Sequence, residues 1–277
     1  MSDRTLRWRH CLLRHHAHDW AILIALAIFE LLLLKVIHPF RRYMNEYMIN
    51  DLRFPVKSFT VPIAALVVIS FAIPLLFILG YYVFKRNTRD LHHAILGLFF
   101  TVIITSVITD SLKNLTGRPR PDFFWRCFPD GVPHFKPISG DVACTGSAGE
   151  VRQGYKSFPS GHASWSFAGL GYLSWYLAGR IKFAGHRGRI IKFVIAALPL
   201  VGATLVAISI MNDYWHHWSD VVAGAVIGLV VGALCYRQQF PIDQERGLIT
   251  EEELGVPNQA QTDIENGNQN QRQPINK

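Results

Sequence analysis

Three short polar segments contain most of the side chains that could take part in chemistry. They are KNLTGRPRPDFFWRC at 113–127, SFPSGHASWSF at 157–167 and SIMNDYWHHWSD at 209–220. Lysine and arginine bind anions, histidine transfers protons or attacks as a nucleophile, and serine donates hydrogen bonds. Each segment adjoins a long apolar run, so these residues lie where membrane-length helices begin or end. The sequence therefore predicts a site for an anionic ligand, assembled from helix ends.

The first segment is strongly cationic. Lys113, Arg118 and Arg120 lie within eight residues, and Gly117 and Pro119 between them favour the end of a helix. The planar guanidinium group of arginine matches the oxygens of a phosphate. We expect this cluster to bind a multiply charged anion. The alternative is a basic helix end that serves only as a signal for membrane topology.

The second segment places Pro159, Ser160, Gly161 and His162 directly before an apolar run. Free N–H groups at a helix N-terminus attract anions, and Gly161 has no β-carbon to obstruct the approach. Ser160 could cap the helix or donate its hydroxyl, and His162 could act as an acid near neutral pH. The alternative is an ordinary helix cap beside an interfacial histidine.

The third segment pairs a histidine with an aspartate. If the chain is helical from Trp215, His216 and Asp220 are four residues apart and share a face. Asp220 would then accept a hydrogen bond from one ring nitrogen of His216 and leave the other nitrogen free to attack. His217 would point to a different surface. An aromatic belt at the membrane interface would explain the tryptophans of this segment, but it would not explain Asp220.

The motifs that usually supply metal ligands are missing from these segments. The sequence has no HExxH or paired-carboxylate motif, and acidic residues are scarce near the three segments. We therefore expect neither a metal ion nor another cofactor at this site.

Apolar residues are bunched into long runs, since the 277-residue chain is 50% hydrophobic but only 17% charged. Runs of about 18 or more apolar residues are long enough to span a membrane. Six runs predict an all-α, six-transmembrane helical bundle over 19–237: 19–38, 61–84, 92–112, 163–180, 190–210 and 220–236. A basic arm, 1–18, precedes the bundle. The polar tail, 238–277, is rich in asparagine and glutamine and is predicted to be disordered.

Basic residues beside the apolar runs account for much of the net charge of +8. They precede the first run and occupy the connections after the second and fourth runs, so we expect no nucleic-acid partner. The positive-inside rule makes this face, and both termini, cytosolic. The three polar segments then share the non-cytosolic face of the endoplasmic reticulum or plasma membrane. An integral membrane protein with its site on that face is predicted.

Two cysteines and one buried acid are also of interest. Cys127 and Cys144 share the long loop after the third run, where an oxidising lumen would permit a disulfide between them. Cys11 and Cys235 are expected to be single thiols at the cytosolic edge. Glu30 interrupts the first apolar run, and it either faces a neighbouring helix or is a buried functional acid.

Together, the three segments resemble the signature of the type 2 phosphatidic acid phosphatase superfamily. Lys113 is followed after six residues by Arg120-Pro121, Pro159 begins Pro-Ser-Gly-His, and Ser209 is followed by His216 and Asp220 at the family's spacing. The six-span layout is similar to the membrane branch, the lipid phosphate phosphatases. The stretches GRPRPDFFWRCFPDG and DYWHHWSD look most like the plant enzymes of that branch. The resemblance covers roughly residues 60–237.

The resemblance implies a metal-independent phosphatase that forms a phosphohistidine on His216, with Asp220 holding the ring. His162 would protonate the leaving alkoxide and later activate water. The phosphate oxygens would be held by a set of donors: Lys113, Arg120, Ser160 and the amide of Gly161. The expected substrate is phosphatidate, giving diacylglycerol and phosphate, with lysophosphatidate and diacylglycerol pyrophosphate as further candidates.

One position departs from the family pattern. The arginine that follows the serine of the third motif falls on Ile210, and isoleucine cannot donate a hydrogen bond to phosphate. Arg118 could assist or replace it. The alternative is a pseudoenzyme that binds lipid phosphate without turnover. A transporter is a further alternative, but it requires a polar path across the membrane, whereas the polar segments share one face.

Overall fold

The computed structural model describes residues 3–181 and 185–241, with side chains from residue 17 onward except those of 182–187. Long helices dominate it: α1 (Asp3–Val36), a continuous helix made of α3 (Ile63–Val67), the π-helical η1 (Val68–Ala72) and α4 (Ile73–Lys85), then α5 (Thr88–Thr116), α8 (Gly161–Arg180), α9 (Gly185–Asn212) and α10 (Trp218–Gln239). Three short helices are α2 (Glu46–Asn50), α6 (Phe123–Cys127) and α7 (Ala148–Gly154). Among the described residues the only β-type pairing is one isolated bridge, Phe135 to Val142. The all-α prediction is confirmed.

Two units divide the chain, residues 1–236 and 237–277, and the helices as far as Tyr236 belong to the first. The predicted tail lies outside the described residues from 242 onward. Within the described residues, 3–18 of the predicted arm are helical and continuous with the first apolar run in α1, which contains neither glycine nor proline to stop it.

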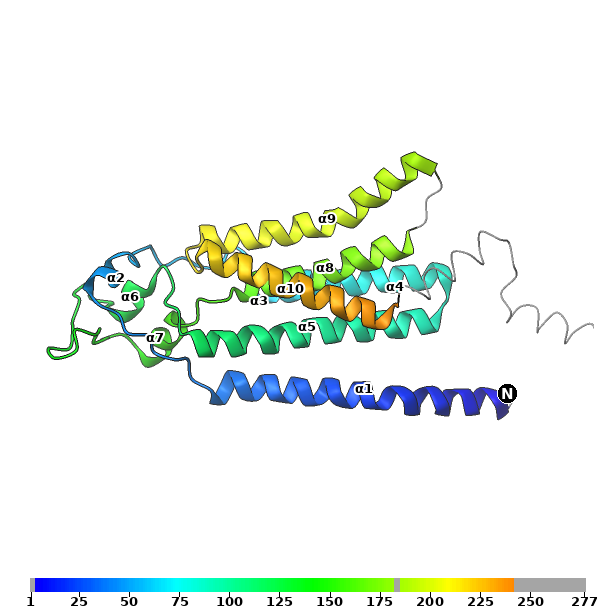
Figure 1. Cartoon of the computed structure of the whole chain (residues 1–277), viewed down its shortest axis with the longest axis horizontal. Helices are drawn as coiled ribbons and strands as arrows, with labels where there is room; N and C mark the ends of the chain where they lie inside the picture. The colour runs from blue at the N-terminus through cyan, green and yellow to red at the C-terminus, as the bar shows by residue number, and fades with distance from the viewer. Residues whose placement is uncertain (1–2, 182–184, 242–277) are drawn as a thin grey trace, which may run out of the picture. The chain divides into compact units, whose positions relative to one another are not determined.

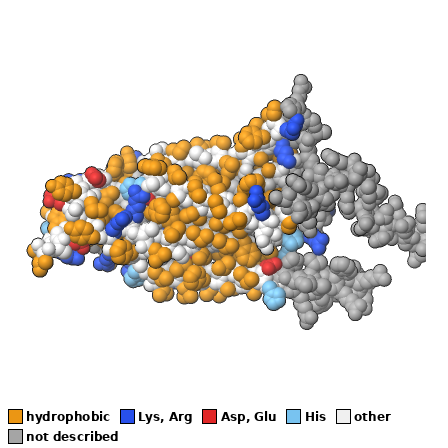
Figure 2. All heavy atoms as spheres, in the orientation of Figure 1, with side chains coloured by type: hydrophobic (Ala, Val, Ile, Leu, Met, Phe, Trp, Pro, Cys, Tyr) orange, Lys and Arg blue, Asp and Glu red, His pale blue; other side chains and the backbone are white. Residues whose placement is uncertain are grey.

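Four helices in the described part of the chain are long and apolar enough to cross a membrane. They are Ile63–Lys85, Thr88–Thr116, Gly188–Asn212 and Trp218–Gln239. They match four of the six predicted runs, and the remaining two runs, 19–38 and 163–180, fall in α1 and α8. Many large apolar side chains of α1, α4 and α9 are exposed, as lipid-facing side chains would be, and hydrophobic side chains cover most of the middle of the face shown in Figure 2.

Helix α8 lies among other helices, in contact with α5, α9 and η1. It also packs closely on α10, where a β-carbon added to Gly228 would come 2.4 Å from the carbonyl oxygen of Ser164. On another side, a β-carbon at Gly169 would come 1.7 Å from the carbonyl oxygen of Ser70. Small residues allow such close helix packing within a membrane.

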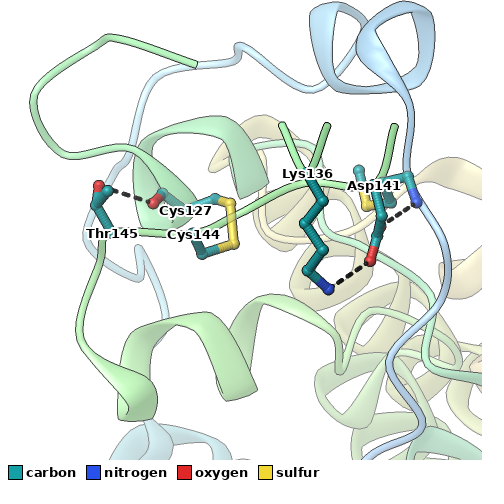
Figure 3. Close-up of a disulfide and its surroundings, with 6 residues drawn as sticks. Cys127, Lys136, Asp141, Cys144 and Thr145 are labelled. Atoms are coloured by element: carbon teal, nitrogen blue, oxygen red, sulfur yellow. Dashed lines mark hydrogen bonds and ion pairs between the residues drawn. A yellow bond between two sulfur atoms is a disulfide. The ribbon is translucent and has the colours of Figure 1, made fainter. Parts of the chain in front are cut away.

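The short helices α2, α6 and α7 gather at one end of the long helices (Figure 1). There a cluster of buried aromatic and apolar side chains packs together, including Phe123, Phe124 and Phe128 with Met44 and Ile49. Cys127 and Cys144 form a disulfide within this layer (Figure 3). The sequence left this pairing open. The two bonded cysteines are 17 positions apart in the sequence.

Further contacts fix the same loop. The amide of Thr145 donates to the carbonyl of Cys127 at 2.9 Å, and its hydroxyl donates to the same carbonyl at 3.5 Å. Asp141 accepts from Lys136 at 3.3 Å and from the amide of Met44 at 3.1 Å; the hydroxyl contact and those of Asp141 are drawn in Figure 3. The long loop is therefore an ordered cap over the helix ends.

Candidate active site

The three polar segments meet at this capped end. Hydrogen bonds join them directly at Asp220, in the first turn of α10. Its carbonyl oxygen accepts from the amide of Ser160 at 2.9 Å, and its Oδ1 accepts from Arg118 at 2.6 Å. Segments separated by up to 102 residues in the sequence thus contact one another, as the analysis of the motifs predicts.

His216 is buried and held by a backbone carbonyl. Its Nδ1 lies 2.6 Å from the carbonyl oxygen of Ser157, so Nδ1 carries the proton and donates. This tautomer leaves Nε2 with its lone pair. The predicted hydrogen bond to Asp220 is not formed, because the Nδ1 to Oδ2 distance is 3.8 Å, which suits only a charge interaction.

The condition under which His216 and Asp220 would share a helical face is not met, since α10 begins at Trp218 and His216 precedes it in a turn. Tyr214 breaks the helical path, with a left-handed φ of 59°. Burial lowers the pKa of His216 to about 3, and the cations Arg120 and Lys113 act in the same direction, against the opposing charge of nearby Asp220. The ring is therefore neutral at neutral pH, as a nucleophile requires.

Asp220 is fully buried and accepts several hydrogen bonds. Besides Arg118 on Oδ1, its Oδ2 accepts from the hydroxyl of Ser157 at 2.6 Å and from the amide of His217 at 3.0 Å. The ring of His217 also lies 3.3 Å from Oδ2, so the prediction that His217 faces a different surface is wrong. Arg118 donates to Ser219 as well, at 2.7 Å. Arg118 thus holds the carboxylate beside His216.

Lys113 and Gly161 are in close contact. A β-carbon at position 161 would lie 2.8 Å from the Nζ atom of Lys113, a distance that real β-carbons essentially never show. Lys113 also forms an ion pair with Asp110, at 3.1 Å. The absence of a side chain at Gly161 thus lets the lysine cation reach the N-terminus of α8.

Arg120 is buried with unused hydrogen-bonding capacity. Its Nε donates to the carbonyl of Gln153 at 2.9 Å, and its guanidinium lies 4.6 Å from the ring centre of Trp215. Its Nη1 is buried without a partner among the described residues. Burial, and then the charge of Arg126, lower its pKa to about 10, so it remains a cation. An unsatisfied buried donor is costly, and a bound anion would remove that cost.

His162 lies in the first turn of α8 and contacts the segment before α3. Its Nε2 lies 3.0 Å from the carbonyl oxygen of Val61, and its ring stacks on Phe59, which in turn stacks on Trp215. Burial lowers the pKa of His162, and the hydrogen bond to Val61 opposes that effect. Ser160 caps α8, its hydroxyl accepting from the amide of Ala163 at 3.4 Å.

Two more contacts hold the segment before α3 over the site. Asp213 accepts from both the amide and the hydroxyl of Thr60, at 2.7 and 2.8 Å. The indole N–H of Trp215 donates to the carbonyl of Lys57 at 2.8 Å.

Ile210 is almost fully buried in an apolar cluster, where the family pattern has arginine. Its neighbours are Ala163, Ala207 and Val221, with Phe59 and Trp215 packed against them. This cluster borders His162 through Ala163. Hydrocarbon therefore fills the volume that a guanidinium group would need.

Ser157 and Trp215 are site residues whose functions the sequence did not reveal. Ser157 contributes a carbonyl to His216 and a hydroxyl to Asp220, and Trp215 lies under two guanidinium groups, of Arg120 and Arg126. The one available signal was position, because both residues fall within the quoted segments.

Within the described residues, no group of three or more His, Cys, Asp or Glu is arranged to hold a metal ion.

Comparison with known proteins identifies the family of the chain. The PAP2 superfamily profile matches residues 94–243, more than half of the chain. The chain belongs to the PAP2 superfamily. Lipid phosphate phosphatase 2 of Arabidopsis thaliana is 53% identical over 228 residues, covering 82% of this chain and 78% of that protein. Lipid phosphate phosphatase 1 of the same plant is 51% identical, covering 82% and 68%.

A more distant PAP2 relative is diacylglycerol pyrophosphate phosphatase 1 of Saccharomyces cerevisiae, 35% identical over 75% of this chain and 69% of its own length. No solved structure matches. The resemblance drawn from the three motifs is confirmed at the level of the family, and the relatives are named as phosphatases. The apolar helices agree with an integral membrane protein.

Proposed function

We propose that this PAP2 protein is a metal-independent lipid phosphate phosphatase that hydrolyses phosphatidate through a phosphohistidine. The observation that carries the proposal is the pairing of a neutral, oriented His216 with an unsatisfied buried guanidinium on Arg120. A nucleophile with a free lone pair beside an empty anion donor suits attack on phosphorus. The plant relatives, named as lipid phosphate phosphatases, support a lipid phosphate as substrate.

In the first step, Nε2 of His216 attacks phosphorus and the bond between phosphorus and the glycerol oxygen breaks. His162 gives a proton to that oxygen, releasing diacylglycerol. The imidazolium that forms is stabilised by the charge of Asp220 at 3.8 Å. Since Nε2 of His162 is occupied by Val61, the proton leaves from Nδ1, or from Nε2 once that contact opens.

In the second step, a water molecule attacks the phosphohistidine and gives its proton to His162. The phosphorus–nitrogen bond breaks, and inorganic phosphate leaves. Through both steps the oxygens are held by four groups: Lys113, Arg120, the hydroxyl of Ser160 and the amide of Gly161. Positioned cations and amides of this kind stabilise phosphoryl transfer.

The membrane arrangement we propose has six spans, with α1 and α8 added to the four helices that are long and apolar enough to cross a membrane. The domain would cover 19–237, and both termini would be cytosolic. The disulfide supports a non-cytosolic site, because such bonds persist in oxidising compartments. The membrane would be the endoplasmic reticulum or the plasma membrane, with substrate chains in the bilayer. Lysophosphatidate and diacylglycerol pyrophosphate are the further substrate candidates.

A pseudoenzyme that binds lipid phosphate is the second candidate. Two observations favour it. Ile210, at the position of the family arginine, has apolar surroundings. Arg118 is already bonded to Asp220, so no other side chain evidently replaces that arginine. The oriented His216 argues for turnover, since a binder has no need of a fixed tautomer.

Phosphate release from phosphatidate in detergent micelles with a chelator present tests the proposal. Wild-type protein, His216→Ala and Ile210→Arg are compared. Turnover by wild type that is lost in His216→Ala supports the phosphatase. If wild type releases no phosphate and Ile210→Arg does, the pseudoenzyme is supported. If none of the three proteins releases phosphate, phosphatidate is contradicted as the substrate.

A further inference from the structure

A second acid lies behind the lysine of the proposed phosphate site. Glu30 of α1 is buried, only 6% exposed, and its carboxyl interacts with that of Asp110 on α5, the helix that packs against α1. Asp110 in turn accepts from Nζ of Lys113 at 3.1 Å. The other carboxyl oxygen of Glu30, Oε2, is buried without a partner among the described residues. A chain of contacts therefore runs from α1 to the N-terminus of α8, where Lys113 meets Gly161.

The chemistry of these groups requires a shared proton. An ionised carboxylate only accepts hydrogen bonds, so two carboxyl groups can bond to each other only if one of them carries a proton. Asp110 faces the ammonium group of Lys113, which favours its ionised form, and Glu30 is the more deeply buried of the two. The proton therefore belongs to Glu30, which donates to Asp110.

We infer that Asp110 and protonated Glu30 are positioning residues for Lys113, and that together they set the affinity of the site for phosphate. Asp110 fixes the ammonium group against Gly161, pointing at the anion. Glu30 anchors Asp110 without adding a second negative charge. An ionised Glu30 would add a second carboxylate charge close to Lys113, and that charge would repel the phosphate dianion.

The inference rests on the proposed phosphate site but not on turnover, so binding is the readout. Thermal unfolding of the full chain in detergent micelles is followed over a series of inorganic phosphate concentrations, which gives a dissociation constant. Turnover is measured on the same preparations. A wild type that binds phosphate without hydrolysing phosphatidate contradicts the proposed function and leaves this test intact. A wild type that is not stabilised by phosphate overturns the inference.

Asp110→Asn is compared with Asp90→Asn, because both acids lie on α5 and each holds a cation. Asp90 pairs with Arg180 at the other end of the helix. Both variants should lower the melting temperature. Asp110→Asn alone should weaken phosphate binding, by about tenfold, the effect of one charge-assisted hydrogen bond. Equal dissociation constants for the two variants would overturn the inference.

Two substitutions of Glu30, Glu30→Gln and Glu30→Leu, distinguish the effect of its proton on phosphate binding from the effect of its packing. Glutamine keeps a neutral donor, so Glu30→Gln should weaken phosphate binding by no more than about threefold, whereas Glu30→Leu should weaken it by about tenfold. Phosphate binding that tightens in Glu30→Gln would mean that Glu30 is ionised in the wild type, and it would overturn the inference. So would a Glu30→Leu variant with wild-type affinity.

Discussion

The charged groups near the two ends of helix α5 differ in how completely they are paired. Near its start, both oxygens of Asp90 are engaged, one by Arg180 and the other by the hydroxyl of Tyr176 at 2.9 Å. Near its end, the cluster around Lys113 and Arg120 retains buried polar atoms without protein partners, Nη1 of Arg120 among them. A satisfied ion pair stabilises the fold, whereas unsatisfied donors mark a place where a ligand completes the bonding. The contrast distinguishes a structural cluster at the start of α5 from a functional one at and just beyond its end.

The largest effect should come from removing the nucleophile. His216→Ala should lower turnover of phosphatidate by at least about a thousandfold, because no other imidazole has its lone pair fixed in this position. Asp90→Asn, at the opposite end, should lower the melting temperature and leave kcat nearly unchanged. Both are measured by phosphate release and thermal unfolding. Comparable losses of turnover in the two variants would remove the distinction between the ends.

Arg118→Met should lower kcat by about ten- to a hundredfold, since Asp220 would lose a charge-assisted donor. Arg118→Lys should recover part of that loss, and circular dichroism should show unchanged helix content in both variants. If Arg118→Met turns over at the wild-type rate, the arginine neither positions Asp220 nor replaces the family arginine.

Ile210→Arg should raise kcat/KM by about tenfold, by adding a cation beside the anion site. The same change should lower the melting temperature, because the guanidinium group displaces apolar packing around Ala163 and Val221. Ile210→Met, which keeps the packing apolar, is the matched control. A loss of kcat/KM in the arginine variant would show that the cluster is needed as it stands.

Gly161→Ala should raise KM by up to about tenfold with a smaller effect on kcat, because the new methyl group displaces Nζ of Lys113. Gly149→Ala in α7 is its control, since a β-carbon there meets nothing within 4 Å. Steady-state kinetics on phosphatidate micelles distinguish the two. Equal KM values would mean that the lysine moves aside at no cost.

The smallest effect on turnover should follow loss of the disulfide. A double Cys127→Ser, Cys144→Ser variant should lose roughly 3 kcal/mol of stability, as expected for a closed loop of this size, yet keep turnover within about threefold. Ion pairs of Arg126 with Asp122 and Glu150 still hold the cap. A reductant should lower the melting temperature of wild type and not that of the variant. A tenfold loss of turnover would make the cap part of the site.

Much of this arrangement follows from the sequence, and the rest depends on tertiary contacts. The motif spacing predicted which residues meet, since long apolar helices with polar ends allow few other arrangements. It did not predict the acceptor for Nδ1 of His216, because a backbone carbonyl such as that of Ser157 carries no side-chain signature. The turn that precedes α10 was not evident for a similar reason. Tyr214 leaves the helical path where Asp213 binds Thr60, a residue 153 positions away in sequence.

The segment that carries Val61 has a practical consequence for work on fragments. The region matched to the PAP2 superfamily begins at residue 94, yet the carbonyl that holds His162, the threonine that fixes Asp213 and the acid behind Lys113 all precede it. A recombinant fragment trimmed to the matched region would retain all three motifs and lose these supports. Such a fragment should neither bind phosphate nor hydrolyse phosphatidate, and its inactivity would say nothing about the motifs themselves.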